Sequence, residues 1–210
     1  MATITISRRF GAGGATLGAR IAKRLGYRYL NDELVKEVAK QVGASVKDIT
    51  SIEKRKRPSK LMLFLEKVIR VDIIERKRRY KPIDVKEYID GIREVILKEY
   101  EQGNCVIIGR GSHYILQNKP DVIHLLVVAS KRFRLKFLMD TYGLREEQAE
   151  RAIERADMIR SDFLYYFSQR ENHDDPLLYT ICFNMDRISM NEAEEMVVNL
   201  VKQRERQSGF

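Results

Sequence analysis

The chain has 210 residues, of which 44% are hydrophobic and 33% are charged. That length suits one domain with a core that needs no disulfides, and no run of about 18 apolar residues could form a membrane-spanning helix. The formal net charge of +9 would suit a polyphosphate, a nucleic acid or an anionic membrane surface. Because no aromatic RNA-binding motif, zinc finger or basic zipper pattern is present, nucleic-acid binding is disfavoured as the main function.

The start of the chain and its few cysteines indicate a cytoplasmic protein. A strand is expected from residue 3, which leaves no room for a signal peptide before it. Cys105 and Cys182 both lie in apolar runs, which predicts buried thiols in a reducing compartment. His113 and His173 have no spacing typical of a metal site or a catalytic triad, and His124 lies in an apolar strand, where we expect a core residue.

The first 25 residues carry the strongest motif. A β-branched run over 3–6 is followed by a glycine-rich segment over 7–18, and apolar residues at Leu17, Ile21 and Leu25 continue the chain as a helix. Glycines let backbone N–H groups approach an anion closely. The helix N-terminus adds unpaired donors and about half a positive charge. The segment therefore predicts a phosphate-binding loop.

This loop departs from a standard Walker A motif, which ends in Gly-Lys-Ser/Thr. Gly14 stands where the lysine is expected, and Ala15 and Thr16 follow it. The lysine that would reach the outer phosphates is thus absent from its usual place. A plain flexible turn is the alternative interpretation of Gly11–Gly14.

Strands and helices alternate along the rest of the chain. Up to residue 102 we predict a short strand at 27–30, helices at 31–42 and 45–53, a basic linker at 54–58, and helices at 59–79 and 84–102. We then predict a strand at 105–109, a short helix at 114–116, a strand at 122–129 and a helix capped by Ser130. The chain is expected to end with a long helix from about 145 to 170, a polar loop at 171–176, a strand at 179–184, and a helix from a capping box at Ser189 to about 204.

Apolar strands that alternate with helices predict an α/β fold with a mainly parallel sheet. Ligands of such sheets bind beyond the carboxyl ends of the strands. The glycine-rich loop follows the first strand, and Arg110 follows the strand at 105–109. We therefore expect the loop and Arg110 to lie at the same edge of the sheet.

Four segments, spread over nearly the whole chain, form a recognisable set. They are Ile4–Arg8 with Gly11–Gly14 and Thr16, Asn31–Glu33, Val106–Gly111, and Asp175–Tyr179 with Asp186–Ser189. On these residues the chain resembles the cytidylate kinase-like family of P-loop proteins, a branch of the nucleoside monophosphate kinase fold. The resemblance implies one domain over 1–210, a P-loop three-layer sandwich. A helical insertion at 31–102 would cover the acceptor nucleotide, and a lid at about 143–175 would close over the donor phosphates.

The resemblance also implies roles for the phosphate loop. Cytidylate kinases transfer the γ-phosphoryl group of ATP to CMP or dCMP with Mg²⁺. Backbone N–H groups would cradle the β-phosphate, and the implied cofactor-binding residues are Gly11, Ala12, Gly13, Gly14, Ala15 and Thr16. The Thr16 hydroxyl would also contact Mg²⁺ or phosphate.

Other residues are implied to act on the acceptor and on the transferring group. Arg110 would bind the acceptor phosphate, and Asp32 would contact the acceptor sugar or base. Arg155 and Arg160 in the lid would close over the transferring group, with Asp157 orienting a lid arginine. From the residues alone, other interpretations stay open: Arg110 as a surface ion pair, Arg155 and Arg160 as solvated helix charges, and Asp32 as a helix cap.

Two departures from the family pattern bear on function. The lysine position is Gly14, and the acidic residue that helps to hold magnesium at a strand end is replaced by Ile108–Gly109. Arg8 or Arg9, just before the loop, would supply the lost charge, because arginine can bind phosphate through two donors.

The sequence thus predicts an ATP-dependent phosphotransferase whose default acceptor is CMP or dCMP. A nucleotide-binding protein with weak or no kinase activity is the alternative, which the missing lysine favours. The arginine-rich lid favours the enzyme, since a mere binder has less need of a closing lid. The expected partners are nucleotide substrates, and the apolar-faced helix at 59–79 could pack on a second subunit.

Overall fold

The structure, a computed structural model, describes residues 2–43, 45–53 and 85–207. Within these residues, one sheet has the strand order β2-β3-β1-β4-β5, and every neighbouring pair is parallel. The strands are β1 (Thr3–Arg8), β2 (Arg28–Leu30), β3 (Cys105–Ile108), β4 (Val122–Val128) and β5 (Ile181–Asn184). Because β1 lies between β3 and β4, the residues that follow these three strands meet at one edge of the sheet.

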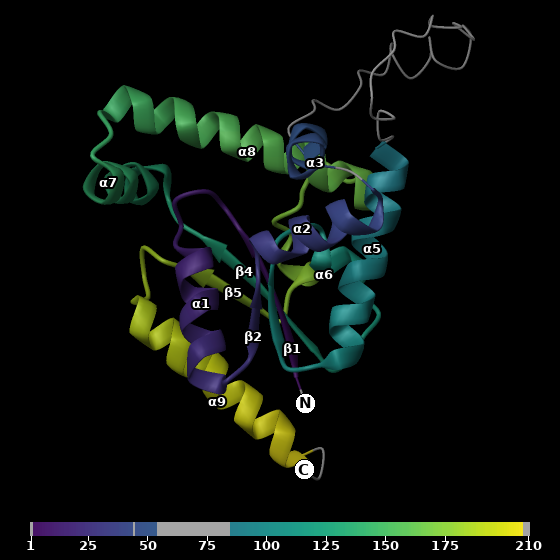
Figure 1. Cartoon of the computed structure of the whole chain (residues 1–210). Coiled ribbons are helices and arrows are strands. Elements are labelled where there is room, and N and C mark those ends of the chain that lie inside the picture. Colours follow the sequence, from purple (N-terminus) through teal and green to yellow (C-terminus); the bar gives the residue numbers. More distant parts are fainter. Residues whose placement is uncertain (1, 44, 54–84, 208–210) are drawn as a thin grey trace, which may run out of the picture.

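Helices cover both faces of the sheet, which confirms the predicted three-layer α/β sandwich (Figure 1). One face carries α1 (Gly14–Leu25) and α9 (Met190–Gln207), and the other carries α2 (Asp32–Gln41), α5 (Val85–Gln102) and α6 (Ser112–Ile115). The remaining helices are α3 (Val46–Glu53), α7 (Lys131–Tyr142), α8 (Glu146–Ser168) and the 3₁₀ helix η1 (Pro176–Leu178). Helix α8 crosses the end of the molecule at which the strands finish.

Alternate strand residues serve two separate cores. Ile4, Ile6 and Ile108 pack toward α1 and α9, whereas Cys105 and Ile107 pack toward α2 and α5. All five side chains are fully buried. Burial on both faces explains why the strands are continuous apolar runs rather than alternating ones.

Side-chain caps fix the starts of two helices, as predicted. At α7 the Ser130 hydroxyl accepts from the Phe133 N–H at 3.2 Å. At α9 the Ser189 N–H donates to the Glu192 carboxylate at 2.8 Å, and the Glu192 N–H donates back to the Ser189 hydroxyl at 3.3 Å. This reciprocal pair is a capping box.

The structure corrects some details of the sequence interpretation. Cys182 is exposed, because it lies on the edge strand β5, so the prediction of a buried thiol holds for Cys105 alone; both are free. Helix α8 ends at Ser168 because Gln169 adopts a left-handed φ of 54°. The predicted linker at 54–58, the helix at 59–79 and the start of the helix at residue 84 lie outside the described residues. Among the helices that the structure describes, none is long and apolar enough to cross a membrane.

Candidate active site

The glycine-rich loop joins β1 to α1 and leaves donors open for an anion. Gly11 and Gly13 have φ angles of +80° and +85°, a conformation that residues with a Cβ rarely adopt. Gly13 is the N-cap of α1, and no side chain caps this end of the helix. The first-turn N–H groups, including those of Ala15 and Thr16, are therefore free to bind phosphate oxygens. The Ala12 N–H is already used, since it donates to the Arg9 carbonyl at 3.2 Å.

Arg134 of α7 supports this loop from behind. Its side chain is buried, and its guanidinium donates to the Phe10 carbonyl at 3.3 Å and to both carboxylate oxygens of Asp157 at 3.0 and 2.8 Å. A Cβ on Gly11 would lie only 3.2 Å from the Arg134 Cβ. Asp157 thus pairs with an arginine outside the predicted lid. Nothing in the sequence marks Arg134 as part of the site beyond its place in a predicted helix.

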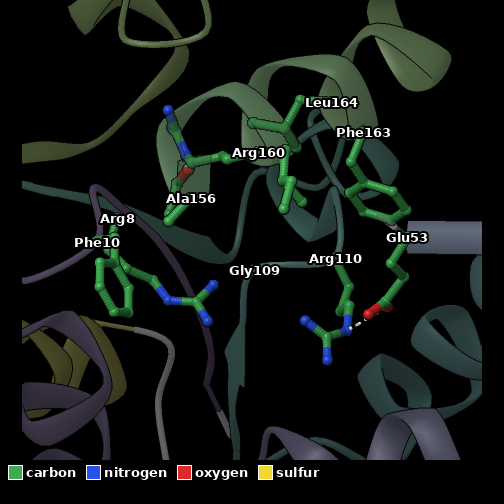
Figure 2. Close-up of a pocket in the computed structure, with 11 residues that line it drawn as sticks. Arg8, Phe10, Glu53, Gly109, Arg110, Ala156, Arg160, Phe163 and Leu164 are labelled. Carbon is green, nitrogen blue, oxygen red and sulfur yellow. Dashed lines mark hydrogen bonds and ion pairs between the residues drawn. The ribbon is translucent and has the colours of Figure 1, made fainter. Parts of the chain in front are cut away.

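A cavity of about 270 Å³ opens between the carboxyl edge of the sheet and α8 (Figure 2). We call it the arginine cavity. It is lined by Ser7, Arg8, Phe10, Glu53, Gly109, Arg110, Ala156, Ile159, Arg160, Phe163 and Leu164. Three guanidinium groups, from Arg8 at the end of β1, from Arg110 in the turn after β3 and from Arg160 of α8, therefore surround one space whose other walls are mostly apolar. Such a lining suits a ligand with a strongly anionic group.

Arg110 is held on the insertion side of the cavity. It has a left-handed φ of 56° between two glycines, an uncommon conformation for a residue with a side chain. Its Nε lies 2.8 Å from the carboxylate of Glu53, the last residue of α3, which also accepts a hydrogen bond from the Tyr88 hydroxyl. Figure 2 shows this ion pair at the cavity wall. No feature of the sequence local to α3 marks Glu53 as a partner of Arg110.

Asp174 connects two further arginines. The Arg160 guanidinium donates to the Ser7 hydroxyl at 2.9 Å and to Asp174 Oδ1 at 2.8 Å, and Arg9 Nε donates to Asp174 Oδ2 at 2.7 Å. Burial acts to raise the pKa of Asp174, but Arg160 and Arg9 hold that pKa below its usual value. The carboxylate is therefore ionised at neutral pH and ties α8 to the end of β1.

Arg8 differs from the other cavity arginines. Among the described residues its side chain has no hydrogen bond or ion pair. Its pKa is lowered to about 10, first by burial and then by the positive charges of Arg110 and Arg160. The guanidinium still carries its proton at neutral pH. It is a desolvated cation that pairs directly with no carboxylate among the described residues, although the charge of Glu53 acts to raise its pKa.

The structure separates the predicted site residues into two sets. Arg8, Arg110 and Arg160 line the cavity, whereas Arg155 is exposed on α8 and Asp32 is exposed at the start of α2. Neither of the last two residues lines the cavity.

The described side chains offer few ligands for a magnesium ion. Within the described residues, no group of three or more His, Cys, Asp or Glu could hold a metal ion. The cavity carboxylate, Glu53, is already paired with Arg110. Mg²⁺ usually keeps several waters and binds substrate phosphates through one or two carboxylates. Among the described residues the donor set therefore fits phosphate groups, and a magnesium ion would take most of its ligands from those phosphates and from water.

Comparison with known proteins agrees with this geometry. The sequence profile of the cytidylate kinase-like family matches residues 3–187. The chain belongs to this family. A search of curated protein sequences found no match.

Two solved structures show the same fold as this family member. An uncharacterized protein from Eubacterium ventriosum has a TM-score of 0.69 at 19% identity, covering 96% of this chain and 99% of that one. A shikimate kinase from Bacteroides thetaiotaomicron has a TM-score of 0.51 at 12% identity, covering 96% of this chain and 98% of that one. Family and fold together support a small-molecule phosphotransferase.

Proposed function

We propose that the protein is an ATP-dependent phosphotransferase that acts on a small acceptor carrying a phosphate group, most simply a nucleoside monophosphate such as CMP or dCMP. The observation that carries the proposal is the convergence of Arg8, Arg110 and Arg160 on one cavity beside an uncapped glycine-rich helix start. Phosphoryl transfer needs positioning and positive charge around the moving group rather than covalent help from the protein.

The geometry suggests how two phosphate-bearing ligands would be arranged. The donor would place its phosphates on the N–H groups at the start of α1. The acceptor phosphate would lie on Arg110, on the side of α3, and Arg160 would contact the group that passes between them. Apolar walls from Phe163 and Leu164 would exclude water, which strengthens these charge interactions.

The predicted division of the chain fits this arrangement. Residues 31–102 would form the acceptor-binding insertion and residues 143–175 the lid within one domain. Arg155 would reach the transferring group only if α8 turns on closing, and Asp32 would contact the acceptor only if α2 moves toward the cavity. Mg²⁺ would arrive with ATP, held by phosphate oxygens and water, with the Thr16 hydroxyl as a further ligand.

A coupled assay of ADP release tests the proposal. The protein is incubated with ATP and Mg²⁺ and with each of CMP, dCMP, UMP, AMP, GMP and, because one structural neighbour is a shikimate kinase, shikimate. We expect turnover with CMP or dCMP, and we expect Arg110→Ala to raise the KM for the acceptor far more than the KM for ATP. Arg151→Ala, which removes an exposed arginine of α8 paired only with Glu147 in the described structure, is the matched control.

The alternative is a nucleotide-binding protein with weak or no kinase activity. Gly14 at the lysine position and the engaged carboxylate of Glu53 favour it. ATP binding detected by calorimetry, without turnover of any acceptor, would support this alternative over the kinase.

A further inference from the structure

Gly14, the residue at the lysine position, has no room for a side chain. A Cβ built there would lie 2.6 Å from the Cβ of Arg8, 3.0 Å from its Cγ and 3.4 Å from the Val127 Cβ. The backbone sets the position of a Cβ, so no change of side-chain rotamer can relieve this overlap. With this backbone, a lysine at position 14 would overlap the Cβ of any residue other than glycine at position 8, and it would also meet the Cγ of Arg8.

The Arg8 side chain begins beside the position where that lysine side chain would begin, and it extends into the cavity. Its stem lies against Gly14, and its guanidinium reaches Gly109, where an added Cβ would overlap Nη1. In Figure 2 the Arg8 and Arg110 side chains approach the same space from opposite sides, beneath the helix that carries Arg160. Gly14 and Gly109 thus form the two ends of a channel shaped for Arg8.

The neighbouring charges leave Arg8 available for a ligand. Glu53 pairs with Arg110, and Asp174 pairs with Arg160 and Arg9. The pKa of Arg8 is lowered by burial and by the two cavity arginines, so an anion in the cavity would relieve an unfavourable arrangement of charge. Arg9 is in a different position, because its Nε is bound to Asp174 and it does not line the cavity.

We propose that Arg8 replaces the missing P-loop lysine and binds the phosphoryl group as it passes from donor to acceptor, and that Gly14 is the compensating change that makes room for it. The inference rests on the proposed phosphotransferase function. It assigns the role to Arg8 and not to Arg9. The same side chain accounts for both departures from the family pattern, because it needs the space beside Gly14 and the space beside Gly109.

A charge-relocation experiment tests this inference. Arg8→Met keeps the stem that packs on Gly14 but removes the charge. We expect it to weaken ATP binding and to slow transfer, roughly tenfold to a hundredfold each, since hydrogen bonds to charged groups are lost. Gly14→Lys alone should lower the melting temperature because its Cβ overlaps the Arg8 stem. The double variant Arg8→Gly with Gly14→Lys, which removes both the Cβ and the Cγ that a side chain at position 14 would meet, should bind ATP more tightly than Arg8→Gly alone.

Controls separate this inference from the proposed function. Arg151→Ala tests for a general effect of lost positive charge, and melting temperatures confirm that each variant is folded. Unchanged ATP affinity and turnover in Arg8→Met, or a double variant no better than Arg8→Gly, would overturn the role of Arg8 while leaving the kinase proposal intact. If no acceptor is turned over but Arg8→Met loses ATP affinity, the kinase proposal fails and phosphate binding by Arg8 stands.

Discussion

At the scale of single residues, the site is built from arginines that differ in what holds them. Arg110 is paired with Glu53, and Arg160 shares Asp174 with Arg9. Arg8 has no such partner among the described residues. Paired guanidiniums are pre-oriented, which lowers the entropy lost when a ligand binds. Binding of an anion would relieve the most electrostatic repulsion at the unpaired guanidinium of Arg8.

Asp174 should be a major contributor to the stability of this arrangement. Its carboxylate is 17% exposed and joins two segments far apart in the chain. Asp174→Asn preserves shape but removes the charge, and we expect the free energy of unfolding to fall by roughly 1–3 kcal/mol. Urea titration monitored by circular dichroism measures this change.

The adjacent residue provides a matched control for that experiment. Asp175 caps η1 through the Leu177 N–H at 3.0 Å and has no ion pair with the described residues. Asparagine can cap in the same way, so Asp175→Asn should leave stability nearly unchanged. Equal losses in the two variants would contradict the assigned role of Asp174.

At the scale of secondary-structure elements, helix starts position the functional edge. The uncapped start of α1 is open toward ligand, whereas the starts of α7 and α9 are closed by serine side chains. The Met190 side chain at the start of α9 lies against Gly13, where an added Cβ would be 2.9 Å from its terminal carbon. A well-formed α9 therefore supports the phosphate loop as well as the core.

Loss of the α9 cap should destabilise the protein measurably. Ser189→Ala removes the hydroxyl that accepts from the Glu192 N–H, and such substitutions cost about 1 kcal/mol. Glu192→Gln retains an oxygen for the reciprocal bond and should cost less. The comparison uses chemical denaturation of the three proteins, and a larger loss in Glu192→Gln than in Ser189→Ala would contradict the capping box.

At the scale of the whole molecule, buried histidines make stability depend on pH. His113 is 2% exposed, neither of its ring nitrogens has a hydrogen-bond partner in the described structure, and burial lowers its pKa to about 3. Burial also lowers the pKa of His124 and of His173. The unfolded chain takes up protons on these residues below about pH 6.5, whereas folded His113 stays neutral down to about pH 3.

The unfolded state therefore binds more protons in this range, and the free energy of unfolding falls as the pH is lowered from 6.5. Each such histidine contributes a slope of at most about 1.4 kcal/mol per pH unit. His113→Phe keeps a ring between Tyr114 and Tyr179 and should reduce the slope. Denaturation at pH 6.5, 6.0, 5.5 and 5.0 tests this, and an unchanged slope would show that His113 is not buried and neutral.

The sequence by itself determined the architecture and part of the site. Apolar runs, glycines and serine caps act over a few residues, so they predicted the parallel α/β sheet and the position of the loop. Parallel strands end at one edge, which was enough to bring Arg110 and the loop together. The same logic could not distinguish Arg8 from Arg9, because both lie where the first strand ends and nothing in the sequence shows which of them faces the cavity.

Only the tertiary structure decided which charges meet. Arg9 and Asp174 are 165 residues apart, and Arg134 reaches a carbonyl 124 residues away. Glu53 contacts Arg110, and no periodic pattern in the sequence predicts this pairing. These pairings depend on how helices cross beyond the sheet edge, which is set by packing of side chains from the whole chain. For the same physical reason, the glycine at position 14 had no explanation until the Arg8 stem was seen to occupy its space.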